Sequence, residues 1–239
     1  MECRCGAHEA IVEVMGLVSN MKKILVLCDD IWHPAEVIEK GLEGLQDEIA
    51  HFDFVRDAKD ILTVELLKEY PLIMNCKSDN LTSGNEAPWF EEGVTEVGPK
   101  EFEDYVRTGG GLLSVHAGNT YHEDNSPEYA QVIGNRFVTH PPRCEVHISV
   151  LQEHAVTKNV ENFTIRDEHY EIELLAEDAE VLLQSESESG GVQTAGYVRT
   201  LGEGRICVLT PGHILSVWRH PMFRQLLTNA IRWCMKESR

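Results

Sequence analysis

The chain has 239 residues, and its 42% hydrophobic content is enough to build the core of one large α/β domain. With 21 basic and 40 acidic residues, its formal charge of -19 would repel nucleic-acid phosphates and anionic lipids, so we expect neither nucleic acid nor a membrane as a partner. The 7 cysteines are odd in number and scattered, which favours reduced thiols in a cytoplasmic protein over a disulfide framework.

The first 20 residues are predicted to form an extension outside the fold. Glutamates interrupt their apolar residues and no basic segment precedes them, which argues against a signal peptide or a membrane span. Cys3 and Cys5 could bind a metal, but no second ligand pair has matching spacing, so incidental thiols are the preferred interpretation. A second start-like sequence begins at Met21, and we expect residues 21–239 to form a single domain.

The next segments alternate between buried strands and amphipathic helices. An apolar run at 22–28 predicts a strand, and Pro34 opens a helix. A second strand is expected at 51–55, Thr63 caps the following helix, and 71–75 forms a third strand. This alternation predicts a doubly wound, mostly parallel sheet with helices on both faces, in which functional sites gather at the carboxyl ends of the strands.

The second half of the chain is predicted to add hairpin strands to this sheet. Pro99 starts a helix that the glycines at 109–111 end, and the strand after them leads into His116. Further strands are expected at 144–151, 180–184, 194–200 and 204–210. The polar segment 185–191 is interpreted as an exposed loop, and Pro221 opens the last helix.

The sequence "SVHAG" at 114–118 resembles the strand-to-helix elbow on which many α/β enzymes carry a nucleophile, but His116 stands at the nucleophile position. Such an elbow predicts a strained backbone and an exposed side chain at the edge of the sheet. The alternative is a hydrogen-bonded histidine in an ordinary loop.

Two other stretches place ionisable groups near strand ends. His213 follows the strand "ICVLT", and "IRDEHYEI" contains Glu168, His169 and Tyr170. Imidazole titrates near neutrality and a carboxylate can orient it, so we predict that His116, His213, Glu168 and His169 are catalytic acids or bases. The same three histidines are candidate ligands of a divalent metal ion.

Candidate substrate-binding residues surround these groups. They follow the first strand, follow the elbow or belong to the acidic stretch: Asp30, Trp32, His33, Asn119, Tyr121, His122 and Tyr170. By contrast, the segment "THPPR" suggests only a turn role for His140. No G-x-G-x-x-G follows the first strand, so no nucleotide cofactor is expected.

Three separated blocks of this sequence carry a family resemblance: "GGGLLSVHAG", "EHAVTKNVENFTIRDEHYEI" and "VRTLGEGRICVLTPGHILSVWRHPMFRQLLTNAIRWC". In order and spacing, they resemble the motifs of the ThuA-like trehalose-utilisation family, from about Lys22 to the C-terminus. The resemblance implies a flavodoxin-like fold similar to class I glutamine amidotransferases. In those enzymes the elbow carries a nucleophilic cysteine, and an imidazole at this position cannot form the thioester that glutamine hydrolysis requires. We therefore expect no glutaminase activity.

The resemblance also implies a role in the metabolism of trehalose, related disaccharides or their keto-sugar derivatives, often alongside sugar oxidoreductases. We predict an enzyme that acts on a small sugar or keto-sugar by acid-base or metal-assisted chemistry, with isomerisation, epimerisation, elimination and hydrolysis all open. The alternative is a non-catalytic sugar-binding or accessory subunit. If the protein is an enzyme, the side chains of His116 and His213 should lie together beside a carboxylate. In an accessory subunit they could point in different directions. A homo-oligomer is also expected.

Overall fold

The computed structural model describes residues 22–46, 48–56, 58–59, 61–78, 94–121 and 126–237. The expectations for residues 1–20 lie outside these ranges. The strands are β1 (Lys23–Leu27), β2 (His51–Val55), β3 (Leu72–Asn75), β4 (Gly111–Val115), β5 (Asn135–Thr139), β6 (Cys144–Val150), β7 (Phe163–Asp167), β8 (Glu171–Leu174), β9 (Glu180–Ser187), β10 (Gly191–Leu201) and β11 (Gly204–Leu209). The helices are α2 (Ala35–Leu42), α3 (Val64–Lys68), α4 (Pro99–Arg107), the short 3₁₀ helix η1 (His116–Asn119), α5 (Pro127–Ile133), α6 (Leu215–Trp218) and α7 (Pro221–Cys234).

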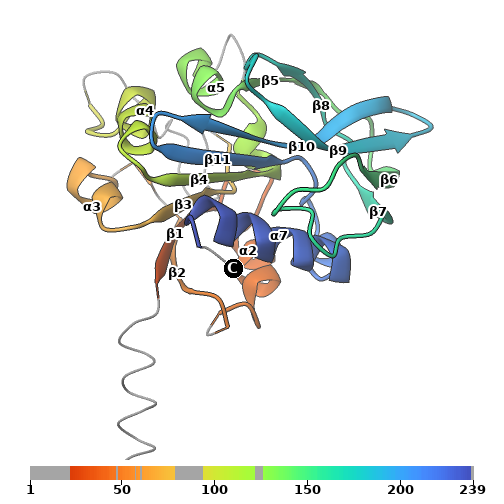
Figure 1. The fold of residues 1–239 in the computed structure, drawn as a ribbon, viewed down its shortest axis with the longest axis horizontal. Coiled ribbons are helices and arrows are strands. Elements are labelled where there is room, and N and C mark those ends of the chain that lie inside the picture. The colour runs from red at the N-terminus through yellow and green to blue at the C-terminus, as the bar shows by residue number, and fades with distance from the viewer. Residues whose placement is uncertain are drawn as a thin grey trace, which may run out of the picture.

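Parallel strands form one half of a nine-stranded sheet with the order β2-β1-β3-β4-β11-β10-β9-β6-β7. The first five strands in this order pair in parallel, as the alternation of strands and helices predicted. Successive residues of β1 point to opposite faces: Ile24 packs into the core under α2, α6 and α7, and Leu25 packs into the core under α3, α4 and α5. Helices therefore cover both faces of the parallel half (Figure 1), and the predicted fold class is confirmed.

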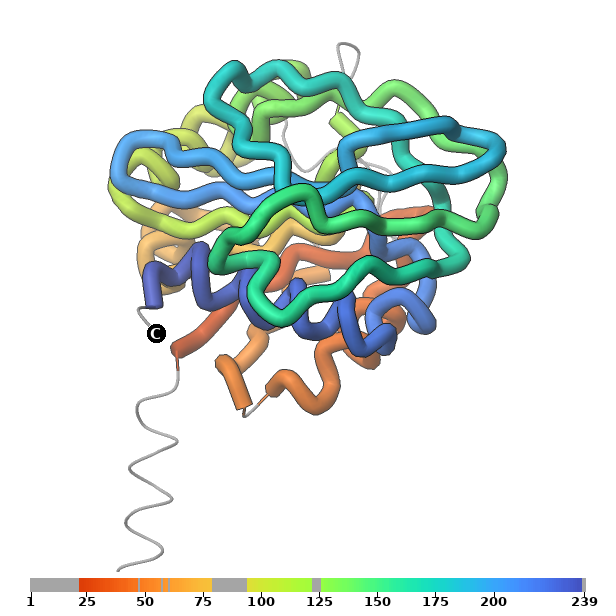
Figure 2. The backbone as a smooth tube through the Cα atoms, turned by 45° about the vertical axis from the view of Figure 1, so that its right-hand side comes forward, coloured from red at the N-terminus to blue at the C-terminus, as the bar shows by residue number. Residues whose placement is uncertain are grey.

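Antiparallel strands extend the sheet at the edge opposite β2 (Figure 2). Here the interpretation of 185–191 as a loop is wrong at both ends, because β9 runs to Ser187 and pairs with β10 from Gly191 onward, and only residues 188–190 form the turn between them. The alternation of buried and exposed residues in this polar segment supports a strand that buries one face only. Strands β5, β7 and β8 and helix α5 were not predicted from the sequence; β5 and β8 pair in a separate two-stranded sheet.

Local signals in the sequence explain where several helices begin and end. The Thr63 hydroxyl accepts a hydrogen bond from the Leu66 amide at 3.1 Å and so caps α3, as predicted. Pro99 and Pro221 occupy the first turns of α4 and α7, where the missing N–H has no helical partner to lose. In the described part of the chain, no helix combines the length and hydropathy that crossing a membrane requires.

Candidate active site

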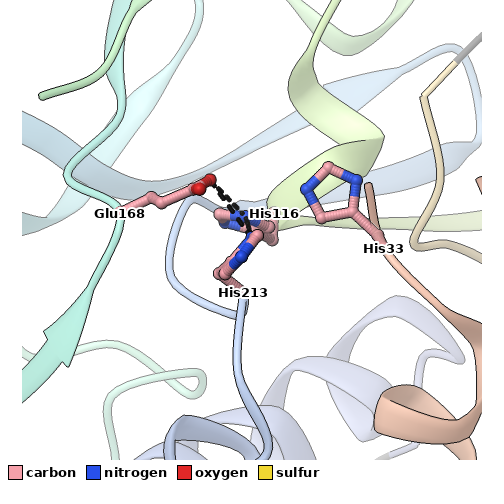
Figure 3. Close-up of side chains that lie close together, drawn as sticks. All are labelled: His33, His116, Glu168 and His213. Atoms are coloured by element: carbon pink, nitrogen blue, oxygen red, sulfur yellow. Dashed lines mark hydrogen bonds and ion pairs between the residues drawn. The ribbon is translucent and has the colours of Figure 1, made fainter. Parts of the chain in front are cut away.

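The carboxyl ends of the parallel strands bring together three histidines from distant parts of the chain. His33 follows β1, His116 follows β4 and His213 follows β11, while Glu168 comes from the end of β7 in the antiparallel half. The four side chains point toward one another (Figure 3). All four were predicted from the sequence as site residues, and the structure places them in one cluster.

His116 is held on the sharp turn that the elbow pattern predicted. Its φ of 47° lies in the left-handed region, which is strained for a histidine. Its Nδ1 lies 2.8 Å from the carbonyl oxygen of Thr210. A carbonyl only accepts hydrogen bonds, so Nδ1 carries the proton and Nε2 offers its lone pair to the cluster.

The surroundings of His116 differ from the expectation of an exposed side chain. The residue is only 2% exposed, and its ring stacks on Tyr170 with 4.1 Å between centroids. Burial lowers the pKa of His116 to about 4, although the neighbouring Glu168 opposes this shift. His116 is therefore a neutral imidazole at neutral pH.

Glu168 is the acidic centre of the cluster. One of its carboxylate oxygens, Oε2, lies 3.4 Å from His116 Nε2, 3.2 Å from His213 Nδ1 and 3.7 Å from His140 Nε2. Partial burial tends to raise the pKa of Glu168, but the imidazoles around the carboxylate outweigh burial and lower the pKa below its usual range. Because Nε2 of His116 carries no proton, the ring that can donate to the carboxylate is His213, through Nδ1–H. Glu168 is therefore a carboxylate that faces imidazole rings.

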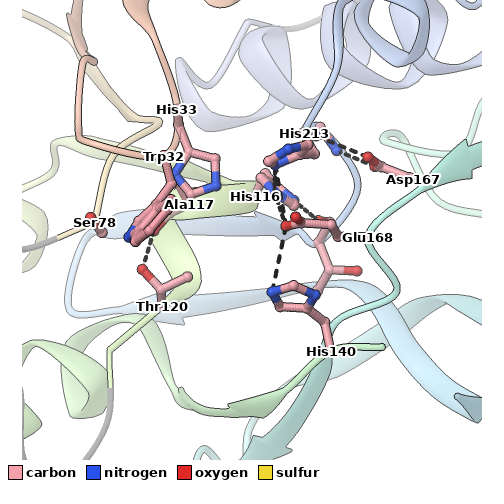
Figure 4. A network of polar contacts seen from close by, with 12 residues as sticks. Trp32, His33, Ser78, His116, Ala117, Thr120, His140, Asp167, Glu168 and His213 are labelled. Carbon is pink, nitrogen blue, oxygen red and sulfur yellow. Dashed lines mark hydrogen bonds and ion pairs between the residues drawn. The ribbon is translucent and has the colours of Figure 1, made fainter. Parts of the chain in front are cut away.

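The neighbouring Asp167 fixes the loop that carries His213. Its two carboxylate oxygens accept hydrogen bonds from the amides of Gly212, at 2.7 Å, and His213, at 3.1 Å. The side chain is completely buried, and burial raises the pKa of Asp167 to about 7 despite the amide donors. Consecutive residues thus have separate roles, since Asp167 holds the backbone of the loop and Glu168 faces the cluster (Figure 4).

Asp30 fixes the ring of His33 in a comparable way. His33 Nδ1 lies 2.8 and 2.9 Å from the two carboxylate oxygens of Asp30, which also accept hydrogen bonds from the amides of Trp32, His33 and Ser78. Burial tends to raise the pKa of Asp30, but these bonds outweigh it and lower the pKa. Nδ1 of His33 is therefore the protonated nitrogen, and Nε2 is buried without a hydrogen-bond partner among the described residues.

A cavity of about 700 Å³ opens in front of the cluster. Its volume is within the usual range for small-molecule sites. His33, Glu168 and His213 lie in its wall, Tyr170 adds an aromatic surface, and Trp32 is 71% exposed beside it. Exposed aromatic rings of this kind can stack on the apolar C–H face of a sugar. The remaining lining residues are Ser78, Thr120, Phe137, His140 and Arg143.

Other predicted site residues point away from the four-residue cluster. Both ring nitrogens of His169 bond to serine hydroxyls on β9, at 2.6 and 2.8 Å, so its ring lies outside the four-residue cluster. Asn119 is buried and donates to the Leu209 carbonyl, and the Tyr121 hydroxyl donates to the Lys77 carbonyl. His122 lies outside the described residues.

Sequence reasoning missed the contribution of the segment after β5. His140 was assigned only to a turn, yet its Nε2 lies within ion-pair distance of Glu168, and Arg143 lines the same cavity. The proline-rich sequence around His140 indicated a turn and gave no sign that the residue lies near Glu168. The histidine content of the segment was the only available signal.

Three solved structures illustrate the fold of the chain. A ThuA-like protein from Bacteroides uniformis is 23% identical, with a TM-score of 0.67 over 91% of this chain and 93% of that one. A ThuA-like protein from Parabacteroides merdae is 16% identical, with a TM-score of 0.70 over 90% of each chain. The β-galactosidase from Rahnella sp. R3 is 13% identical, with a TM-score of 0.65, and 96% of this chain matches 34% of that enzyme. At these identities the likeness shows the fold alone.

No protein with a curated description matches the chain. The family model described as "ThuA: Trehalose utilisation" matches residues 23–234 and so covers the three sequence blocks and all four residues of the cluster. The chain therefore belongs to the ThuA trehalose-utilisation family.

Proposed function

We propose that this protein is an enzyme that acts on a small sugar or keto-sugar in the cavity beside Glu168. Membership of the trehalose-utilisation family supports a carbohydrate-related role. The observation that carries the proposal is the convergence of His116 and His213 on the Glu168 carboxylate, with 3.2 to 3.4 Å between the contacting atoms. A protein that only binds sugar has no need of this convergence.

The cluster is suited to removing a proton from a carbon atom next to a ketone. In this step Glu168 takes the proton, and the electron pair of the C–H bond forms the C=C bond of an enolate. The negative charge moves to the former ketone oxygen. Isomerisation and elimination both proceed from such an enolate. A keto-sugar is the product of a sugar oxidoreductase, so an enzyme of that class is the proposed supplier of the substrate, in the cytoplasm.

Thiol chemistry does not belong to the proposed function. The elbow carries His116, and the described cysteines that follow parallel strands are poor nucleophiles. Burial raises the pKa of Cys28 to about 12 and that of Cys76 well above its usual value. We therefore propose that the protein has no glutaminase activity.

The test is hydrogen–deuterium exchange in D₂O, followed by proton NMR on a panel of 3-keto-glucosides and 3-keto-disaccharides. Exchange at the carbon atoms next to the ketone reports proton removal whatever the final product is. We expect Glu168→Gln to slow exchange at least about 100-fold. The control is Glu173→Gln on β8, which alters an ion pair with Arg136 of β5 at the surface and should leave the rate unchanged.

The outcomes separate the two functional hypotheses. Exchange that depends on Glu168 supports the enzyme. Binding of a keto-sugar without exchange or product formation would instead support a sugar-binding accessory subunit. Equal rates for Glu168→Gln and the wild type would show that Glu168 is not the base.

A further inference from the structure

The hydrogen bonds around the cluster leave it rich in electron pairs and poor in protons. His33 and His116 each use Nδ1–H on an oxygen acceptor outside the cluster, which directs the bare Nε2 inward. Glu168 adds a carboxylate oxygen. The donor atoms of these three residues and of His213 all lie within 4.8 Å of one another. Two of the four residues are buried and two are half-buried, and a group of this composition calls for a cation.

Three of the four donor atoms are spaced like ligands of one metal ion. Nε2 of His116, Nδ1 of His213 and Oε2 of Glu168 form a triangle with sides of 3.3, 3.4 and 3.2 Å. Zinc binds nitrogen and oxygen at about 2.0 to 2.1 Å, so two ligands of a tetrahedral ion are about 3.3 to 3.4 Å apart. These three atoms therefore already outline one face of a coordination tetrahedron.

Hydrogen bonding alone does not satisfy the same atoms. His213 Nδ1–H can donate to Glu168 or His116, but one proton cannot serve both. Nε2 of His33 is buried and has no partner among the described residues. The three histidines also line a second cavity of about 10 Å³, whose other walls are mainly apolar and do not include Glu168.

We propose that His33, His116, His213 and Glu168 bind one divalent transition-metal ion of the zinc class. Three imidazoles and one carboxylate favour zinc, cobalt or nickel over magnesium or calcium, which prefer oxygen ligands. Asp30 and the Thr210 carbonyl supply the outer hydrogen bonds that typically orient metal-binding histidines.

The position of the site gives the metal ion a chemical role that rests on the proposed function. His33, Glu168 and His213 also line the larger cavity, so a substrate there can approach the metal ion. A ketone oxygen bound to the ion would have its developing negative charge stabilised as the enolate forms. With Oε2 of Glu168 bound to the metal ion, the second carboxylate oxygen of Glu168 would take the proton from the substrate.

The test begins with untagged protein that has been stripped with a chelator and dialysed. Zinc is titrated in competition with a chromophoric chelator, and we expect one equivalent to bind. Cobalt is then added, and its visible absorption should show the intense bands of a four- or five-coordinate ion rather than the weak bands of an octahedral one. This spectrum needs no variant, so it remains informative if a variant fails to fold.

Variants identify the ligands. We expect Glu168→Gln, His33→Ala and His213→Ala each to weaken zinc binding at least tenfold and to change the cobalt spectrum. The matched control is His147→Ala, an exposed histidine on β6 that bonds to Thr164, and it should bind as the wild type does. A variant with both Cys3 and Cys5 changed to serine should also keep the site.

Three results would overturn the proposal: no stoichiometric zinc binding, loss of binding in the cysteine variant, or equal losses in His147→Ala and the ligand variants. The metal site and the proposed function can fail separately. Tight zinc binding without any keto-sugar exchange overturns the function alone. Exchange at the full rate in metal-free protein overturns the role of the metal alone.

Discussion

Replacement of Asp30 by asparagine tests whether the hydrogen bonds behind His33 hold its ring for binding. In the wild type, the buried carboxylate accepts three backbone amides and the His33 Nδ1–H, at 2.8 to 2.9 Å. An asparagine oxygen can keep the bonds to the amides of Trp32 and His33, but its NH₂ group would then face the Ser78 amide. One buried donor is left opposite another, which costs about 1 to 3 kcal/mol.

Two measurements check this reasoning. For a chain of this length, about 1 kcal/mol corresponds to about 2 to 4 °C in Tm, so Asp30→Asn should lower Tm by about 2 to 12 °C. The weaker acceptor behind His33 should also reduce zinc affinity about 10- to 100-fold. The control Asp53→Asn changes a partly exposed carboxylate on β2 that accepts the Tyr70 hydroxyl, and it should leave zinc affinity unchanged. Wild-type Tm and zinc affinity in Asp30→Asn would refute the reasoning.

Four other substitutions have distinct expected outcomes. Gly118→Ala would place its Cβ 2.2 Å from the Asn75 carbonyl oxygen. Scanning calorimetry should therefore show that the free energy of unfolding falls by about 1 to 3 kcal/mol. His169→Ala should lower Tm by at least about 2 °C, because it removes the hydrogen bonds between the buried ring and two serine hydroxyls on β9, yet isothermal titration should show unchanged zinc affinity. Trp32→Ala should raise KM for the sugar at least about threefold while Tm stays within about 2 °C. His116→Cys should release no ammonia from glutamine in a coupled assay. Measurable glutaminase activity would contradict the conclusion that the residues around the elbow do not support a thiolate nucleophile.

The parallel half of the fold could be predicted because its signals are local. Short runs rich in apolar residues predicted β1, β2 and β3, and each lies within one residue of its expected bounds. Prolines and Thr63 located the starts of helices through their own backbone chemistry. The antiparallel extension was harder because its strands are exposed on one face and carry polar residues such as those at 185–187. β9 pairs with β10 across a short turn, but its other partner, β6, is distant in the sequence.

The part of the candidate site that lies at the ends of neighbouring parallel strands could be predicted from the sequence. His116 and His213 follow strands that pair in parallel, so the sheet places them side by side. Glu168 and His169 could not be distinguished from the sequence, since they are adjacent residues and their directions depend on the bend after β7. In the structure, Glu168 faces the cluster and His169 faces β9. His140 was missed because its approach to Glu168 depends on β5, which has no clear sequence signal.

The charges around the elbow explain why a histidine, rather than a cysteine, suits this position. A thiolate is stabilised by a neighbouring positive charge, but the group opposite His116 is the Glu168 carboxylate. A buried thiol at the same place would face a negative charge and two further imidazoles, and it would remain protonated. An imidazole anchored through Nδ1 to the Thr210 carbonyl instead contributes an electron pair and no charge. The strained elbow that delivers a nucleophile in other enzymes therefore delivers a neutral ligand here, and the surrounding residues favour binding a cation over forming a covalent bond to the substrate.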